Sequence, residues 1–121
     1  MKTFLVIGAV LGFLSVAIGA FGAHALDGRV PEKYLGNWQT GVTYQMFHTG
    51  AIFVVAILIA QLGSSPLLTW AGWLFVIGIV IFSGSLYVLT VTQISILGAI
   101  TPIGGVAFLV GWVLLLLAAI R

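Results

Sequence analysis

The sequence predicts an all-α integral membrane protein with four transmembrane helices in an up-and-down bundle, and two observations support this. The chain of 121 residues is 62% hydrophobic and only 5% charged, whereas soluble domains are about a quarter charged. The 24 residues from Thr3 to Leu26 carry no charged side chain, and neither do the 87 residues from Tyr34 to Ile120. Since a spanning helix needs about 20 apolar residues, the first stretch holds one span and the second holds three. We therefore expect a single membrane domain over residues 1–121.

The first span is predicted over residues 3–25, between Lys2 and Asp27. A cleaved signal peptide is the alternative, because Ala23-His24-Ala25 imitates a cleavage site. The apolar core of a signal peptide is about 7–15 residues long, and the uncharged stretch here is longer. We therefore favour a helix that stays in the membrane.

The segment 27–40 is the only substantial polar stretch of the chain. Pro31 and Glu32 suit the first turn of a helix. Proline lacks a backbone N–H, which would have no partner within the helix at this position, and an acidic side chain interacts favourably with the helix dipole. Tyr34, Leu35 and Trp38 would then share one face. We predict a short interfacial helix here, with its aromatic side at the level of the lipid headgroups.

The remaining spans are predicted over residues 41–62, 67–90 and 101–120. A Gly63-Ser64-Ser65-Pro66 turn separates the second from the third, with Ser65 as cap and Pro66 in the first turn. Thr101-Pro102 offers the same kind of start to the last span. Small residues recur at steps of four and three in the first span and, more weakly, in the last span, which favours close helix packing within the subunit over a subunit interface or a ligand contact. They are Gly8, Gly12, Ser15, Gly19, Gly22, Gly104 and Gly105.

Most polar side chains of the predicted spans fall in one leaflet, because successive spans reverse direction. This set comprises His24, Tyr44, Gln45, His48, Ser83, Ser85, Tyr87 and Thr101. Tyr44, Gln45 and His48 are three and four residues apart, so they share a helical face that could meet His24 in a hydrogen-bonded cluster. His48 is predicted about 10 Å below Gly41, and no polar group is expected at the bilayer centre.

The histidines and serines of this set have plainer explanations too. A histidine near a helix end, such as His24, is often satisfied by water or a carbonyl group. His48 lies deeper, where an ionisable side chain indicates a functional role. Ser83 and Ser85 are expected to bond to helix carbonyls. The start of the last span could point unpaired N–H groups at an anion or a polar ligand.

Several classes of function are disfavoured by composition. Without cysteine there is no thiolate metal site and no cysteine nucleophile. The carboxylates Asp27 and Glu32 lie in the polar segment, and no nucleophile–base pair is specified by spacing. The pI of about 9.4 rests on four basic residues against two acidic ones, which is no nucleic-acid patch. We expect no enzyme, no metal and no cofactor in the leading hypothesis.

Three functional hypotheses remain. The first is a non-enzymatic, small oligomeric or assembly-type subunit whose partners are the lipid bilayer and a second copy or another membrane protein. The second is a transporter or channel component for protons or a small polar solute, since histidine suits proton relay. The third is haem binding, with His24 and His48 as the two axial ligands.

Four segments of the chain resemble a known family. They are residues 19–26 (GAFGAHAL), 44–48 (YQMFH), 82–87 (FSGSLY) and 98–105 (GAITPIGG). They resemble the small multi-pass bacterial membrane proteins of the YgdD and YwdK type, which are related to a small animal transmembrane protein. The resemblance implies a four-helix protein of the bacterial plasma membrane and no particular activity. One departure is Val91-Thr92-Gln93, where a glycine turn is expected in relatives.

The orientation in the membrane is nearly balanced. Lys2 and Arg121 fall on one side, and Arg29 and Lys33 fall on the other, which is a tie under the positive-inside rule. We predict that both termini are cytoplasmic.

Overall fold

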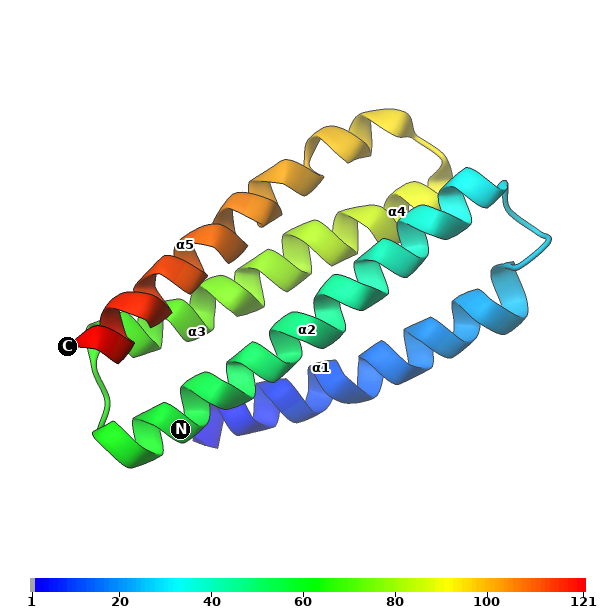
Figure 1. Ribbon diagram of the computed structural model, residues 1–121. Coiled ribbons are helices and arrows are strands. Elements are labelled where there is room, and N and C mark those ends of the chain that lie inside the picture. Colours follow the sequence, from blue (N-terminus) through cyan, green and yellow to red (C-terminus); the bar gives the residue numbers. More distant parts are fainter. Residues whose placement is uncertain (1) are drawn as a thin grey trace.

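Four long helical rods run alternately up and down in the computed structural model, which describes residues 2–121 (Figure 1). The first rod is α1 (Lys2–Phe21) followed by one π-helical turn, η1 (Gly22–Leu26), and the second is α2 (Glu32–Leu62). The third joins α3 (Pro66–Gly78), the π-helical turn η2 (Ile79–Ser83) and α4 (Gly84–Thr92). The fourth is the 3₁₀-helix η3 (Ser95–Ala99) followed by α5 (Thr101–Ile120). All four rods are long and apolar enough to cross a membrane, which confirms the predicted all-α membrane fold.

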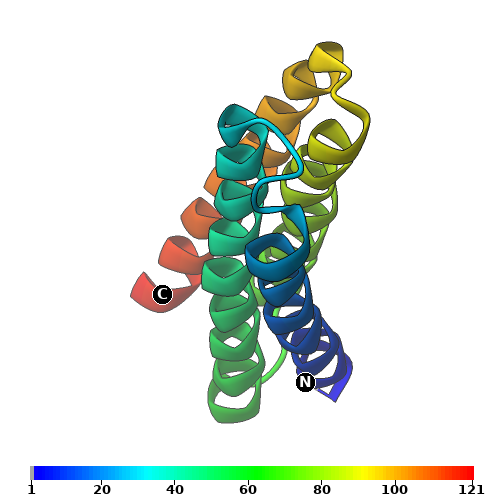
Figure 2. The same ribbon diagram turned by 90° about the vertical axis from the view of Figure 1, so that its right-hand side faces the viewer.

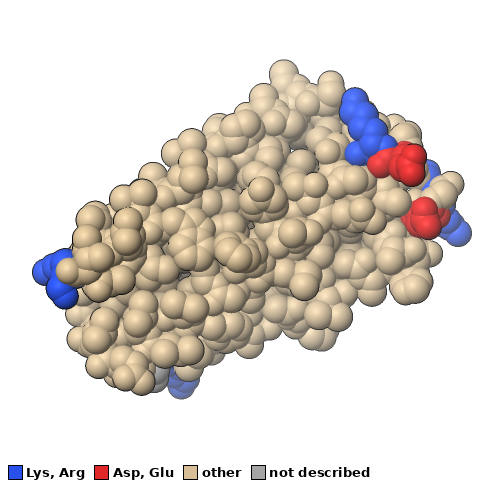
Figure 3. Space-filling view, viewed as in Figure 1, with Lys and Arg blue, Asp and Glu red and all other residues tan. Residues whose placement is uncertain are grey.

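The rods pack as two pairs joined through α2. The most extensive contacts are those of α3 with α5 and of α1 with α2, and α2 also packs against α3 and α4. The two chain ends lie at the same end of the bundle, as Figures 1 and 2 show. In Figure 3 charged groups appear only at the two ends of the molecule, with a wide uncharged band between them. That band is the surface expected to face the hydrocarbon.

The segment 27–40 differs from its prediction. Residues 27–31 form a tight connection with Gly28 at φ +81°, and the helix then runs without a break from Glu32 to Leu62. No proline lies between these ends to stop it. The 31 residues of α2 measure about 46 Å, so this helix extends beyond a hydrocarbon layer of about 30 Å. The interfacial helix is therefore the protruding first turns of the second span.

The side chain of Trp38 also differs from its prediction, because it is buried between helices. It is only 7% exposed, and its indole N–H donates to the carbonyl of Ile18 at 2.9 Å. Gly22 makes room for it, because a Cβ added there would lie 2.5 Å from Trp38 Cδ1. Trp38 therefore packs inside the protein, where it fixes the end of the first rod to α2.

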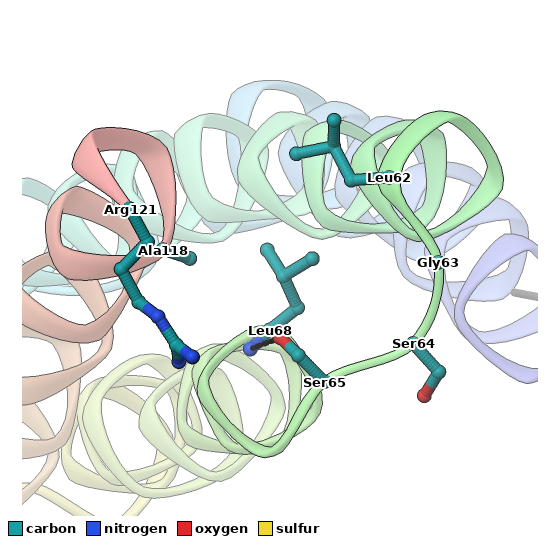
Figure 4. A pocket seen from close by; sticks show the side chains of 7 residues that line it. All are labelled: Leu62, Gly63, Ser64, Ser65, Leu68, Ala118 and Arg121. Carbon is teal, nitrogen blue, oxygen red and sulfur yellow. Dashed lines mark hydrogen bonds between the residues drawn. The ribbon is translucent and has the colours of Figure 1, made fainter.

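The predicted turn between the second and third spans is confirmed. Gly63 has φ +87°, a conformation that favours glycine. The Ser65 side chain then accepts a hydrogen bond from the Leu68 N–H at 3.3 Å, with Pro66 in the first turn of α3. This end of the bundle also holds a cavity of about 300 Å³ lined in part by Leu68, Ala118 and Arg121, into which Arg121 extends from α5 toward the start of α3 (Figure 4).

The small residues of the first span lie along the surface that packs on α2. Built Cβ atoms at Gly8 and Gly19 would lie 2.9 Å from the Phe53 ring and 3.4 Å from Val42, and Gly12 lies against Thr49. Ser15 is buried and donates to the carbonyl of Leu11, one turn earlier in its own helix.

The glycines of α5 meet the third rod. Gly104 is buried against the backbone of Phe82 in η2, where a Cβ would lie 2.8 Å from Phe82 Cα. Its neighbour Gly105 is half-buried, and a Cβ there would lie 3.9 Å from the Phe82 ring, an ordinary contact. The core of the half of the bundle that holds the chain ends is apolar; it contains Ile52, Val55, Ala56, Leu68, Ala71 and Phe75.

Candidate functional site

Gln45 joins three helices at once. Its side chain is 2% exposed, and its Nε2 donates to the carbonyl of Leu11 in α1 at 2.9 Å. Its Oε1 accepts a hydrogen bond from the Tyr87 hydroxyl of α4 at 2.7 Å. The Tyr87 ring also packs against Trp38 at 4.8 Å between centroids. An amide suits this place because it carries a donor and an acceptor on one side chain.

Hydroxyl groups make three further bonds between rods. The buried Ser83 donates to the Gly41 carbonyl at 2.7 Å, and the buried Thr90 donates to the Tyr34 carbonyl at 2.9 Å. The hydroxyls of Ser85 and Thr101 are 2.6 Å apart and form the bond between α4 and α5.

Thr101 therefore does not act as predicted. Its side chain pairs with Ser85 and does not cap α5. The preceding η3 continues into α5, and the Ile103 N–H donates to the Ile100 carbonyl at 3.0 Å. Because a helical turn precedes it, the start of α5 does not present the row of free N–H groups that an anion needs.

His48 is held by a partner that the sequence did not reveal. The ring is 3% exposed, and Trp112 Nε1 donates to its Nε2 at 3.0 Å. Since an indole N–H is only a donor, Nε2 must be the unprotonated nitrogen. Nδ1 then carries the proton and donates to the Tyr44 carbonyl at 2.9 Å. The ring also stacks on Phe108, with centroids 3.6 Å apart and planes 10° apart.

His48 and Trp112 both lie near the middle of their helices. Trp112 is eleven residues, about 16 Å, from the start of α5, whose full length is about 30 Å. His48 is likewise close to the middle of α2.

His24 does not join these residues, so the predicted cluster of both histidines is wrong. Its side chain is exposed in η1. Gly22 faces Trp38 of α2, and a residue two positions further on points to nearly the opposite side of a helix. His48 faces Phe108 and Trp112 of α5, whereas α1 packs on another face of α2. Two rings so placed are not a pair of axial haem ligands.

Tyr44 lies beside His48, but its environment differs from that of Gln45, which is buried. It is 43% exposed, and its ring packs against Phe82 at 4.6 Å between centroids. None of the hydrogen bonds formed within residues 2–121 uses its hydroxyl. Seven of the eight predicted site residues thus make separate contacts between rods, His24 stands apart, and the eight do not form one site.

A groove lies between α2 and α5 beside these residues. Its volume is about 450 Å³, and it is lined by Tyr44, Phe47, His48, Phe82, Pro102, Gly105, Val106, Phe108, Leu109 and Trp112. Pro102 stands at the start of α5 and Trp112 past its middle, ten residues or about 15 Å apart. The groove therefore extends along about half the length of α5.

Sequence reasoning missed three residues that hold the rods together, namely Trp38, Thr90 and Trp112. The sequence did contain one indication for Trp112. A tryptophan in the middle of a span lies away from the membrane interfaces, where this residue type is enriched. An indole N–H at that depth needs an acceptor on another helix. Which acceptor it meets is visible only in the folded chain.

The buried polar side chains of the described residues are all engaged in hydrogen bonds. Within residues 2–121 no group of three His, Cys, Asp or Glu side chains is placed to hold a metal ion. Every buried side-chain nitrogen or oxygen in that range has a hydrogen-bond partner. The arrangement is well suited to holding helices in register.

Comparison with known proteins finds related membrane proteins. Residues 18–105 match the model of a family described as "Protein of unknown function (DUF423)". The chain is 55% identical to the UPF0382 membrane protein YwdK of Bacillus subtilis over 121 residues, which cover 100% of this chain and 98% of that protein. It is 46% and 47% identical to UPF0382 membrane proteins of Staphylococcus aureus and Staphylococcus epidermidis, with the same coverage. No solved structure matches the chain significantly.

Proposed function

The chain belongs to the DUF423 family of membrane proteins, and we propose that it is a non-enzymatic, small assembly-type subunit of the bacterial plasma membrane. In this proposal it associates through its membrane-facing surface with a second copy of itself or with another membrane protein. The bacterial origin of the relatives supports the choice of membrane.

The observation that carries the proposal is the use of the polar side chains within the spans. Gln45, Ser83, Tyr87 and Thr90 all bond to another rod of the same chain. In a bilayer, such bonds and close small-residue packing replace the hydrophobic drive for helix association. Residues used in this way serve the fold, which favours a structural role over catalysis.

The outer faces of α1 and α5 supply the surface for association. Large apolar side chains stand outward along both helices, among them Val10, Phe13 and Val16 of α1 and Ile103, Leu109 and Leu116 of α5. These faces contact lipid in a single copy, and they are the surfaces on which another helix can pack.

The proposal is tested by measuring the assembly state without extraction into detergent. Membranes that contain the protein are crosslinked and then divided into native lipid discs for mass measurement. We expect a defined homo-oligomer or a stoichiometric complex with another membrane protein. A population of single copies with no constant partner would contradict the proposal.

Proton or solute transport is the second candidate, and the depth of His48 is the observation in its favour. Against it stands the apolar layer beyond His48, where Ile52, Val55 and Phe75 are fully buried. Such an apolar layer provides no polar path along which water could cross.

A flux assay distinguishes the assembly role from the transport role. Proteoliposomes loaded with a pH-sensitive dye are given a proton gradient, and wild type is compared with His48→Ala. We expect equal and background-level flux from both. A wild-type flux that disappears in His48→Ala would overturn the non-transport assignment.

A further inference from the structure

The groove between α2 and α5 has features that packing alone does not explain. It is open on the membrane-facing side of the bundle, where Phe47 and Val106 on its rim are 64% and 58% exposed. Because it lies at the depth of the hydrocarbon, any molecule that fills it enters from the lipid and not from water. Its volume of about 450 Å³ is in the range of small-molecule sites.

The walls of the groove are mainly aromatic. Tyr44, Phe47, Phe82, Phe108 and Trp112 all line it. Phe108 is held flat against His48, and Trp112 is fixed by its hydrogen bond to the same ring. Rigid rings of this kind favour stacking or edge contacts with another flat ring over contact with a flexible acyl chain.

Tyr44 adds a polar requirement. Its ring belongs to the groove wall, and its hydroxyl has no hydrogen-bond partner within the described chain. A tyrosine hydroxyl is a hydrogen-bond donor, so it favours an occupant of the groove that offers an acceptor.

We propose that this groove binds a flat, lipid-soluble molecule whose ring carries a carbonyl acceptor, the chemistry of a membrane quinone. The ring lies among the aromatic walls, the Tyr44 hydroxyl donates to the ring carbonyl, and the hydrophobic tail extends into the bilayer. The buried His48 forms part of the wall, because both of its ring nitrogens are already engaged. The proposal concerns binding alone and adds a ligand to the assembly role proposed above.

Gly105 provides a way to fill the groove from inside the structure. It is half-buried, lines the groove, and has only an ordinary contact with Phe82 at 3.9 Å from a built Cβ. Gly105→Leu therefore occupies the space of the ligand. Gly50→Leu is the matched control, because Gly50 is exposed on α2 and has nothing within 4 Å of a built Cβ. Val106→Phe covers the groove from its exposed rim without adding a tryptophan, and it is a second variant in case Gly105→Leu does not fold.

The experiment is a titration of the whole protein in phosphatidylcholine nanodiscs with decylubiquinone, followed by quenching of tryptophan fluorescence. Trp70 and Trp73, both exposed, are changed to phenylalanine so that Trp112 dominates the change. We expect saturable quenching in this background and in Gly50→Leu. We expect binding at least about tenfold weaker in Gly105→Leu or Val106→Phe, and about fivefold weaker in Tyr44→Phe, which loses one hydrogen bond.

Three outcomes would overturn the proposal. Quenching that rises linearly without saturation means that the quinone only dissolves in the lipid. Equal saturation in the filled variants means that it binds elsewhere. Equal competition by decanol, which has the chain but no ring, means that the groove holds an acyl chain. None of these outcomes bears on the assembly state, so this proposal and the assembly role fail independently.

Discussion

At the scale of single residues, the polar side chains of this protein act as links between helices. Gln45 shows this most clearly, because its side-chain amide donates to the Leu11 carbonyl of α1 and accepts from the Tyr87 hydroxyl of α4. His48 is a second case, in which an ionisable ring near the middle of the bundle is held in one neutral tautomer by Trp112 and Tyr44. A polar residue inside a span is thus no direct evidence of catalysis.

Replacing Gln45 tests this interpretation. Gln45→Leu keeps the bulk of the side chain but removes the bond to the Leu11 carbonyl, which keeps its bond from Ser15, and leaves the Tyr87 hydroxyl without its partner. We expect a loss of about 1–3 kcal/mol in the free energy of unfolding, since two bonds between membrane helices are removed. The measurement is unfolding of the detergent-solubilised protein by sodium dodecyl sulfate.

Gln39→Leu is the control, because Gln39 is exposed on the same helix. We expect it to leave stability nearly unchanged. Tyr87→Phe combined with Gln45→Leu should cost less than the sum of the two single changes, since both remove the same bond. A Gln45→Leu variant as stable as wild type would refute the role of this residue as a link.

At the scale of elements, the contact of α5 with the π-helical turn η2 determines how closely the last two rods approach. η2 lies between α3 and α4, and Phe82 within it presents its backbone to Gly104. Gly78, at the end of α3, is likewise covered by the ring of Phe108. Where backbone meets a glycine at this distance, no side chain can rotate away to make room for a methyl group.

The adjacent glycines of α5 therefore differ in their tolerance. Gly104→Ala should destabilise the protein by about 1–3 kcal/mol, because its methyl group would collide with the Phe82 backbone. Gly105→Ala should be nearly neutral, because its contact is ordinary, and alanine has the better helix propensity. Thermal unfolding of both variants in detergent measures the difference. Equal stability of the two would show that the rods can separate at this contact at little cost.

At the scale of the whole molecule, four spans bring the two chain ends to one side of the membrane. Figure 1 shows both ends at the same end of the bundle, and Figure 3 shows charge at both ends of the uncharged band. The basic residues outside the spans are balanced, so the positive-inside rule does not choose the orientation.

Reporter fusions settle both points. Green fluorescent protein and alkaline phosphatase are fused in turn before Lys2 and after Arg121, and their activities are measured in intact bacteria. We expect both ends to give fluorescence and no phosphatase activity, which places both termini in the cytoplasm. Ends that report opposite sides would contradict the four-span topology, and two ends outside would reverse only the orientation.

The sequence by itself determined the spans, the hairpin turn at Gly63 to Pro66 and the stripe of small residues on the first span. These are local properties: uncharged length decides whether a helix can cross lipid, and helical periodicity decides which residues share a face. The polar residues were recognised for the same reason, since each is conspicuous in an apolar stretch.

The tertiary structure alone decided what each polar side chain meets, because the partner depends on how each rod is rotated about its axis. Gly22 faces α2, and His24 two positions later is therefore exposed, although His24 was expected to meet the helical face of Tyr44, Gln45 and His48. Trp112 meets His48 across 64 residues of chain, and nothing local to either residue specifies that contact. Rotation and the insertion of π-helical turns are set by packing over the whole interface, so the pairing of residues could be read only from the folded molecule.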